Sequence, residues 1–162
     1  MGLFDIFSKK MDEQYFNEGH NFFKQGSYAK AIESCDKAIA INPNYHNAWN
    51  LRGYALFCLG QHAEAVASCD KAIAINPNKA DAWTIRGTAL VLLGRFAEAL
   101  DSCDKAIAIN PNYNPAWTAR GVILDKLDRY TESVDSFDKA IAINPNDTNT
   151  KNLRRLALEK LT

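Results

Sequence analysis

The sequence predicts an all-α solenoid of four helix-turn-helix repeats that ends in a capping helix. The first observation is the stretch SCDKAIAINPN, which begins at Ser34, Ser68 and Ser102 and returns as SFDKAIAINPN at Ser136. Each copy lies 34 residues after the one before it. The second observation is a set of glycines at the same interval: Gly19, Gly53, Gly87 and Gly121. A period in this range is typical of stacked supersecondary units.

The chain opens with an apolar segment, residues 1–11, in which Leu3, Phe4, Ile6 and Phe7 are unusually hydrophobic for a tail. We expect it to pack as a short helix on the first repeat. Weak binding to a membrane surface and insertion into the groove of a neighbouring molecule remain alternatives. A segment of this length with two lysines is short for stable membrane anchoring.

The four repeats are predicted at residues 12–45, 46–79, 80–113 and 114–147. In the second repeat, apolar spacing indicates a first helix over about 48–59 and a second over about 63–75. Gly60 suits a left-handed cap between them, and the same slot holds Gly26, Gly94 and Asp128. Pro77 ends the second helix, because the residue before a proline is biased away from the helical conformation.

Glycines inside the first helices need a reason, because each costs about 1 kcal/mol relative to alanine. Close approach of the second helix supplies one. We expect each glycine to face a small residue of its own repeat, in the pairs Gly19–Ala31, Gly53–Ala65, Gly87–Ala99 and Gly121–Ser133.

Residues 148–162 complete the predicted architecture as a capping helix. Leucines at positions 153, 156, 158 and 161 follow helical spacing, and lysine, arginine and glutamate lie between them. Terminal units of repeat arrays carry such a polar outer face.

The repeated residues resemble the tetratricopeptide repeat. The pattern is Trp49, Gly53, Leu56, Ala65, Ala72 and Pro77, which returns as Trp83, Gly87, Leu90, Ala99, Ala106 and Pro111. This resemblance covers about residues 12–147. It implies a right-handed superhelix whose concave groove is lined by the first helices, and a binding role toward peptides or protein segments.

A second pattern joins consecutive repeats. An arginine follows an aspartate after 16 residues in four places, which we predict to be inter-repeat ion pairs: Asp36–Arg52, Asp70–Arg86, Asp104–Arg120 and Asp138–Arg154. The first repeat has Glu18 in the arginine slot, where no upstream repeat exists to supply an aspartate. The alternative is that these are solvated charges that recur only because the repeats were duplicated.

No residue pattern predicts catalysis, a metal site or a cofactor. Cys35, Cys69 and Cys103 share one slot that Phe137 fills in the fourth repeat, which indicates a buried packing position. Cys58 is expected near the groove, where packing remains the simpler role. The three histidines lack the spacing of a metal-binding helix, and no glycine-rich phosphate loop is present.

The resemblance places first-helix positions that do not pack on other helices on the groove wall. These positions are Phe16, His20, Phe23, Asn50, Tyr54, Phe57, Thr84, Thr88, Val91, Thr118, Val122 and Asp125. Their amides and hydroxyls could bond an extended peptide backbone, and the apolar members could hold its side chains. The alternative is that they are ordinary half-exposed residues without a partner.

One branch of the family binds the acidic tails of heat-shock chaperones through a clamp of lysine, asparagine and arginine. Its slots hold Phe16, His20, Leu51, Asp81 and Ile85 in one register, and Asn50, Tyr54, Ile85, Pro115 and Ala119 in the next. Neither set contains a lysine or arginine for a carboxylate. We therefore predict that this protein does not bind such a tail.

Composition narrows the remaining classes. The chain has 19 basic and 19 acidic residues and a formal net charge of zero, which argues against a nucleic-acid partner. No apolar run is long enough to span a membrane. We expect a cytoplasmic, non-enzymatic scaffold that binds a protein or peptide segment; a self-associating structural module, and hence a homo-oligomer, is the alternative.

Overall fold

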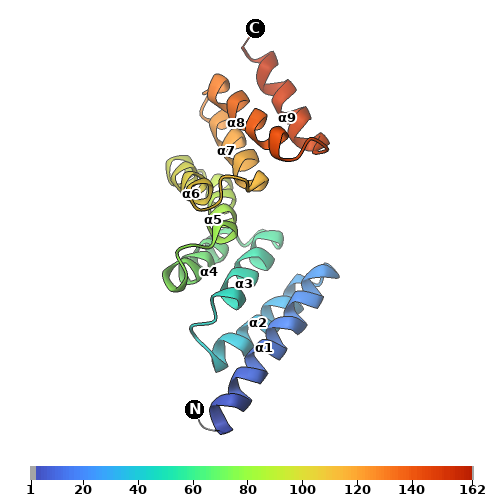
Figure 1. The fold of residues 1–162 in the computed structure, drawn as a ribbon, viewed down its shortest axis with the longest axis vertical. Helices are drawn as coiled ribbons and strands as arrows, with labels where there is room; N and C mark the ends of the chain where they lie inside the picture. Colours follow the sequence, from blue (N-terminus) through green and yellow to red (C-terminus); the bar gives the residue numbers. More distant parts are fainter. Residues whose placement is uncertain (1–2, 162) are drawn as a thin grey trace.

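The computed structural model describes residues 3–161, with side chains from residue 10 onward, and within that range it contains nine α-helices and no strand (Figure 1). The helices are α1 (Leu3–Lys24), α2 (Tyr28–Ile41), α3 (His46–Cys58), α4 (His62–Ile75), α5 (Ala80–Leu92), α6 (Phe96–Ile109), α7 (Asn114–Lys126), α8 (Tyr130–Ile143) and α9 (Thr148–Glu159). The predicted helix pairs are therefore present in all four repeats, and α9 is the capping helix.

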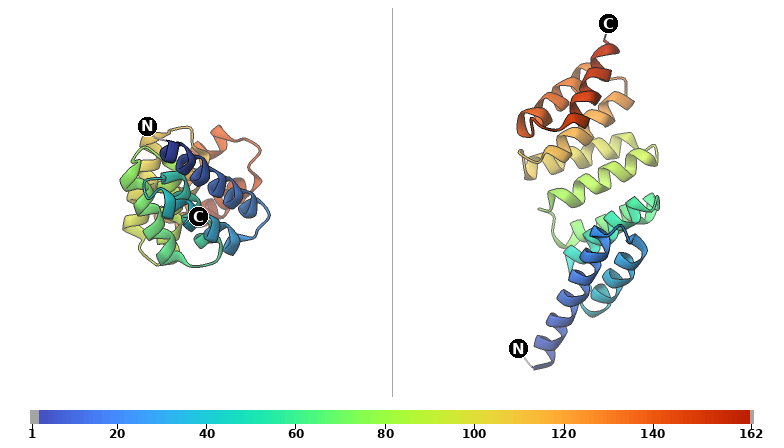
Figure 2. Two further views of the ribbon diagram at one scale, coloured as in Figure 1. Left: turned by 90° about the horizontal axis from the view of Figure 1, so that it is seen from below. Right: turned by 90° about the vertical axis from the view of Figure 1, so that its right-hand side faces the viewer.

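The helices stack along one axis in chain order (Figures 1 and 2). Every helix packs on the next one, and each first helix also contacts the first helix of the following repeat: α1 with α3, α3 with α5, α5 with α7, and α7 with α9. The second helices α2, α4, α6 and α8 do not contact one another. First helices therefore lie closer together than second helices, which places them on the inner side of a curved stack.

The repeated NPN sequence builds the turn between repeats. In the first copy, Asn42 accepts a hydrogen bond from the backbone N–H of Asn44 (3.1 Å), an Asx-type turn. The indole of Trp49 then donates to the carbonyl of Pro43 (2.9 Å). Trp83 and Trp117 repeat this bond to Pro77 and Pro111. The half-buried tryptophans thus fix the turns that lead into α3, α5 and α7.

The turn inside each repeat is as predicted. Gly26, Gly60 and Gly94 adopt positive φ angles of 73°, 78° and 72°. Asp128 takes the same conformation at 57°, which non-glycine residues other than Asn and Asp seldom adopt.

Close helix approach explains the glycines inside the first helices. A Cβ on Gly53 would lie 2.8 Å from the Cys69 sulfur and 3.2 Å from the Ala65 carbonyl oxygen. In the fourth repeat a Cβ on Gly121 would lie 2.5 Å from the Phe137 ring. No side chain beyond hydrogen fits at these positions without movement of its neighbours.

Ser133 replaces the alanine of the earlier repeats without leaving a buried hydroxyl unsatisfied. Its hydroxyl is fully buried and donates to the carbonyl of Gly121 at 2.8 Å. The expected Gly121–Ser133 approach is therefore also a hydrogen bond.

The N-terminal segment differs from the expected short helix. The backbone is one uninterrupted helix, α1, from Leu3 to Lys24, and its first turns project beyond α2 (Figure 2). The side chains of residues 3–9 lie outside the described part of the chain, so their contacts and the boundary at residue 11 stay predictions.

The capping helix is anchored to the fourth repeat at both ends. At its start, Asp147 caps α9 by accepting from the Thr150 backbone N–H (3.0 Å), and the hydroxyls of Thr150 and Thr118 are 2.9 Å apart. At its end, the Lys160 ammonium donates to both carboxylate oxygens of Asp125 at 2.8 and 2.7 Å.

Candidate functional site

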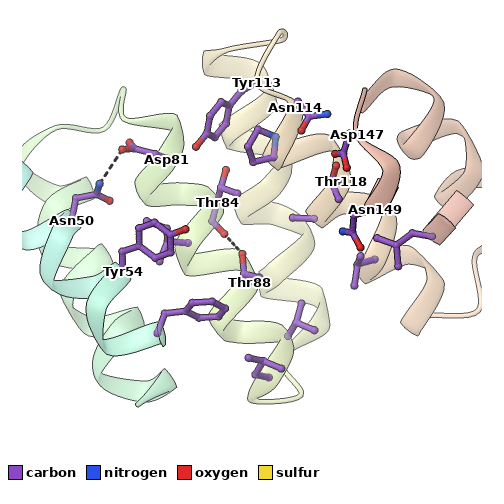
Figure 3. Close-up of a pocket in the computed structure, with 18 residues that line it drawn as sticks. Asn50, Tyr54, Asp81, Thr84, Thr88, Tyr113, Asn114, Thr118, Asp147 and Asn149 are labelled. Carbon is purple, nitrogen blue, oxygen red and sulfur yellow. Dashed lines mark hydrogen bonds between the residues drawn. The ribbon is translucent and has the colours of Figure 1, made fainter. Parts of the chain in front are cut away.

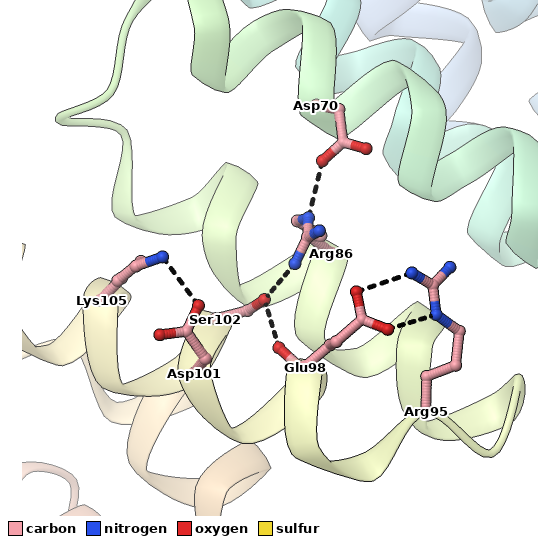
Figure 4. A network of polar contacts seen from close by, with 7 residues as sticks. All are labelled: Asp70, Arg86, Arg95, Glu98, Asp101, Ser102 and Lys105. Atoms are coloured by element: carbon pink, nitrogen blue, oxygen red, sulfur yellow. Dashed lines mark hydrogen bonds and ion pairs between the residues drawn. The ribbon is translucent and has the colours of Figure 1, made fainter.

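Two systems of side chains run along the stack, and the first is a ladder of ion pairs. The Arg52, Arg86 and Arg120 side chains meet the preceding repeat's aspartate at 2.7, 2.6 and 2.7 Å, and Arg154 contacts Asp138 in the same way. We call these four pairs the Arg–Asp ladder. Figure 4 shows the Arg86 rung. That the ladder sets the angle between repeats stays a prediction.

Each of the first three rungs has a third member that was not foreseen. Arg86 donates to Ser102 at 2.7 Å as well as to Asp70, so it joins three helices, α4, α5 and α6 (Figure 4). Arg52 and Arg120 do the same with Ser68 and Ser136. The signal was in the sequence, because each serine follows its arginine by 16 residues, as each arginine follows its aspartate.

The repeated cysteines belong to the core. Cys35, Cys69 and Cys103 are completely buried free thiols, and Phe137 fills their slot in the fourth repeat with 1% exposure. Burial raises the pKa of each thiol to about 12. Cys58 is exposed, and its pKa is raised, first by partial burial. Thiols held in the protonated form are weak nucleophiles and weak metal ligands.

The second system is a pocket on the inner side of the stack (Figure 3). It has a volume of about 700 Å³ and lies between α3, α5, α7 and the start of α9. Eight of the residues predicted for the groove line it: Asn50, Tyr54, Phe57, Thr84, Thr88, Val91, Thr118 and Val122. Whether they bind a partner stays a prediction, but they share one open surface.

The four other predicted residues do not line this pocket. Phe16 packs against Tyr45 with ring centroids 5.2 Å apart, and the exposed His20 stacks on Phe16. Phe23 packs against Tyr54, a residue of the pocket wall, with ring centroids 4.6 Å apart. The Asp125 carboxylate is engaged by Lys160. The pocket therefore covers the second to fourth repeats and the cap.

The threonine hydroxyls are less available than expected. Thr84 is 7% exposed and donates to the Ala80 carbonyl at 2.9 Å, and Thr88 donates to the Thr84 carbonyl at 2.6 Å. Threonine in a helix commonly bonds the carbonyl one turn back. These hydroxyls keep only acceptor capacity for a ligand, and their methyl groups add apolar surface.

About half of the pocket wall lies outside the predicted groove positions. Four of these residues, Asp81, Ile85, Pro115 and Ala119, were considered only as slots of the chaperone clamp. The others are Leu92, Tyr113, Asn114, Asp147, Asn149 and Leu153. Leu92 was recoverable, because it lies one helical turn after Thr88. Asn149 and Leu153 were missed because α9 was treated only as a cap.

The polar part of the wall is rich in oxygen. Asn50 donates its amide N–H to Asp81 at 2.9 Å, which leaves its buried carbonyl oxygen without a partner among the described residues. The Tyr113 hydroxyl points toward Asp81 in Figure 3. The pKa of Tyr113 is raised by burial and by the charge of Asp81. The lining residues include two carboxylates, Asp81 and Asp147, and no lysine, arginine or histidine.

Family models for the tetratricopeptide repeat match residues 16–80, 80–113 and 115–147. The chain therefore belongs to the tetratricopeptide repeat (TPR) family. The expected fold, a right-handed superhelical solenoid of four repeats with a capping helix, is confirmed. Membership supports a general role as a protein–protein interaction scaffold.

Solved structures share this fold. TTC0263, a thermophilic TPR protein of Thermus thermophilus, is 19% identical with a TM-score of 0.82, covering 93% of this chain and 82% of that one. MamA of Desulfovibrio magneticus RS-1 is 20% identical with a TM-score of 0.76, covering 93% and 91%. The first TPR of Spaghetti (RPAP3), bound to the HSP90 peptide SRMEEVD, is 25% identical with a TM-score of 0.69, covering 72% and 92%. A comparison with curated proteins finds no match.

Two further features are absent from the described residues. No helix there is long and apolar enough to cross a membrane. No three His, Cys, Asp or Glu side chains converge there as a metal site would require.

Proposed function

We propose that this protein is a non-enzymatic scaffold that holds a peptide or protein segment in the pocket between α3, α5, α7 and α9, which we call the groove. The observation that carries the proposal is the groove itself, an open pocket with a volume of about 700 Å³ that is lined by three repeats and the cap. A surface of this size is in the range of ligand pockets.

The wall has the character of a binding surface rather than a catalytic one. Tyr54 and Leu92 expose 42% and 57% of their surface in the groove, although both are large and apolar. Apolar side chains left open beside a pocket favour a partner that covers them. The wall lacks an enclosed acid–base pair, and the zero net charge gives no basis for binding a nucleic acid.

We also propose a cytoplasmic location. All four cysteines are free thiols, and three of them lie in one repeated core slot without a disulfide partner. Free thiols are typical of a reducing compartment.

The groove does not suit the acidic tail bound by the RPAP3 domain. Its lining carries the Asp81 and Asp147 carboxylates and no cation, and SRMEEVD contains two glutamates and ends in an aspartate. Like charges brought together in a partly buried site repel. Titration of SRMEEVD should therefore show no saturable binding at concentrations where a groove ligand binds.

A double variant tests the proposal. Tyr54→Ala with Leu92→Ala removes exposed apolar surface from the groove, whereas Phe57 is unsuitable because it packs on the core. The matched control is Leu59→Ala with Leu93→Ala, two exposed leucines that lie outside the groove. Proteins captured from native lysate would be identified, and their contact segments synthesised and titrated by calorimetry. Loss of binding in the groove variant alone is the expected result; equal binding by both variants contradicts the proposal.

Self-association is the second candidate, and exposed leucines favour it. On α9 and just beyond its end, Leu156 and Leu161 expose 46% and 49% of their surface, and Met11 on α1 exposes 47%. Helices α1 and α9 lie at opposite ends of the stack (Figure 1), where head-to-tail contacts would form. Light scattering after size exclusion decides between the candidates: a mass that rises with concentration, and that Leu156→Ala lowers, supports self-association.

A further inference from the structure

The groove has two chemically different ends. What we call the oxygen-rich end consists of Asn50, Tyr54, Asp81 and Tyr113. The apolar end consists of Phe57, Val91 and Leu92. The first set lies mostly near the starts of α3, α5 and α7, and the second near the ends of α3 and α5. Figure 3 shows the Tyr54 and Tyr113 rings facing the space beside Asp81 and Thr84.

The oxygen-rich end offers acceptors that its own neighbours do not use up. The Asp81 side chain is 38% exposed, and its Oδ2 receives one bond from Asn50 at 2.9 Å. An ionised carboxylate can accept about four hydrogen bonds. Oδ1 accepts the Ala82 backbone N–H at 3.0 Å, and Lys79 forms a longer ion pair with Oδ2 at 3.5 Å, so part of the carboxylate's hydrogen-bonding capacity stays open. The Asn50 carbonyl oxygen beside it is buried, so the exposed carboxylate of Asp81 is the acceptor that a ligand can reach.

Two tyrosine rings add a second kind of attraction for a cation. The faces of aromatic rings attract ammonium and guanidinium groups within about 6 Å of the ring centre. Tyr54 and Tyr113 line the groove on either side of Asp81, from α3 and from the turn before α7. A carboxylate flanked by aromatic rings in a half-buried site is therefore suited to a positive group and unsuited to a negative one.

We infer that the bound segment carries a lysine or arginine at the oxygen-rich end and a large apolar side chain at the apolar end. This inference rests on the proposed function and names the chemical class of its ligand. The two ends are separated along α5 by the ten residues from Asp81 to Val91, a rise of about 15 Å. An extended chain covers that distance in about four or five residues. The reach of the cationic side chain shortens the spacing, so the predicted motif has about three to five residues between cation and apolar group by the same geometry.

The experiment is selection of random twelve-residue peptides displayed on phage, with the full chain immobilised. Enriched peptides should pair Lys or Arg with Leu, Ile, Phe or Met at the predicted spacing and should be depleted of Asp and Glu. One such peptide is then titrated by fluorescence anisotropy. Replacement of its cation by Gln should weaken binding about tenfold, the loss of one charge-assisted bond. The effect should shrink in high salt.

Variants of the chain locate the contact. Asp81→Asn should weaken binding of that peptide about tenfold and leave the cation→Gln peptide unaffected. Asp81→Lys should restore binding to a peptide whose cation is replaced by Glu. The control is Asp101→Asn, which removes a carboxylate paired with Lys105 on α6, outside the groove, and should change affinity less than about twofold. Circular dichroism confirms that each variant is folded.

The outcomes separate this inference from the proposed function. Apolar peptides that bind equally well with and without the cation overturn the inference and leave the groove as a binding site. Enrichment of acidic peptides, or binding that Asp81→Asn does not change, also overturns it. If no peptide is enriched, both the inference and the proposed function fail.

Discussion

At the ladder, the same contacts recur from repeat to repeat, and in the groove they do not. Arg52, Arg86 and Arg120 each join an aspartate of the preceding repeat to a serine of their own. One slot on the groove wall instead holds Tyr54, Thr88 and Val122 in successive repeats, that is, an aromatic ring, a hydroxyl and a branched apolar group. The arginines of the ladder and the residues of this groove slot lie on the same first helices, α3, α5 and α7.

This difference separates scaffold from site within a single helix. Residues that contact the neighbouring repeats meet nearly the same partner each time, so one residue type suits every copy. Residues on the groove wall meet no equivalent partner, so their identities are free to differ. We infer that repetition supplies stability and that the unrepeated positions supply specificity.

The largest expected effect is alkaline unfolding through the repeated thiols. Buried Cys35, Cys69 and Cys103 keep their protons to about pH 12, whereas the ordinary pKa is 9.0. Between these values the unfolded chain binds fewer protons, so the free energy of unfolding falls as pH rises and is unaffected by these thiols below about pH 9. Urea unfolding at a series of pH values from neutral to strongly alkaline measures this fall. Cys103→Ala should make it shallower; an unchanged slope would contradict burial as its cause.

The next effect concerns the slot that differs in the fourth repeat. Phe137→Ala empties a fully buried ring site against Gly121 and should cost about 3–5 kcal/mol. Cys103→Ala removes only a sulfur from the same slot in the third repeat and should cost about 1 kcal/mol. Urea unfolding at neutral pH compares the two, and equal losses would show that the slot is not a packing position.

The ladder gives a smaller effect that depends on position. Arg86 is 16% exposed and bonds both Asp70 and Ser102, so Arg86→Ala should cost about 1–2 kcal/mol. Arg154 is 36% exposed and bonds Asp138 but no serine among the described residues, so Arg154→Ala should cost about 0.5 kcal/mol. Thermal unfolding in low and high salt measures both. A larger loss at Arg154 would contradict the role given to the serine.

The smallest effect on stability is expected in the groove. Tyr54 exposes 42% of its surface, and its ring packs against Phe23, so Tyr54→Ala should lower the free energy of unfolding by less than about 0.5 kcal/mol. Calorimetric unfolding measures it. A loss as large as that of Phe137→Ala would make Tyr54 part of the core rather than of a binding surface.

The sequence was sufficient for the features that repeat. Helix bounds, the positive φ at Gly60 and Asp128 and the burial of the Cys69 slot all follow from a register that four copies define. The four Arg–Asp ion pairs could be predicted for the same reason, because an interval of 16 residues separates each aspartate from its arginine.

Features outside the register were not predictable. The Asp125–Lys160 pair joins the fourth repeat to the cap once only, so no interval pointed to it. Thr84 was expected to face a ligand, but a helical hydroxyl finds a carbonyl one turn back at little cost. Tyr113 lies at the turn before α7, where its direction depends on the path of the turn rather than on helical spacing.

One comparison of variants tests the division between scaffold and site most directly. A peptide selected on the wild-type chain is titrated onto Tyr54→Ala with Leu92→Ala and onto Arg86→Ala, and the unfolding free energy of each is measured in the same buffer. We predict that the groove variant loses binding and keeps most of its stability, whereas Arg86→Ala keeps its affinity and loses stability. Undiminished affinity in the groove variant, or affinity that falls in step with stability in both, would contradict the account.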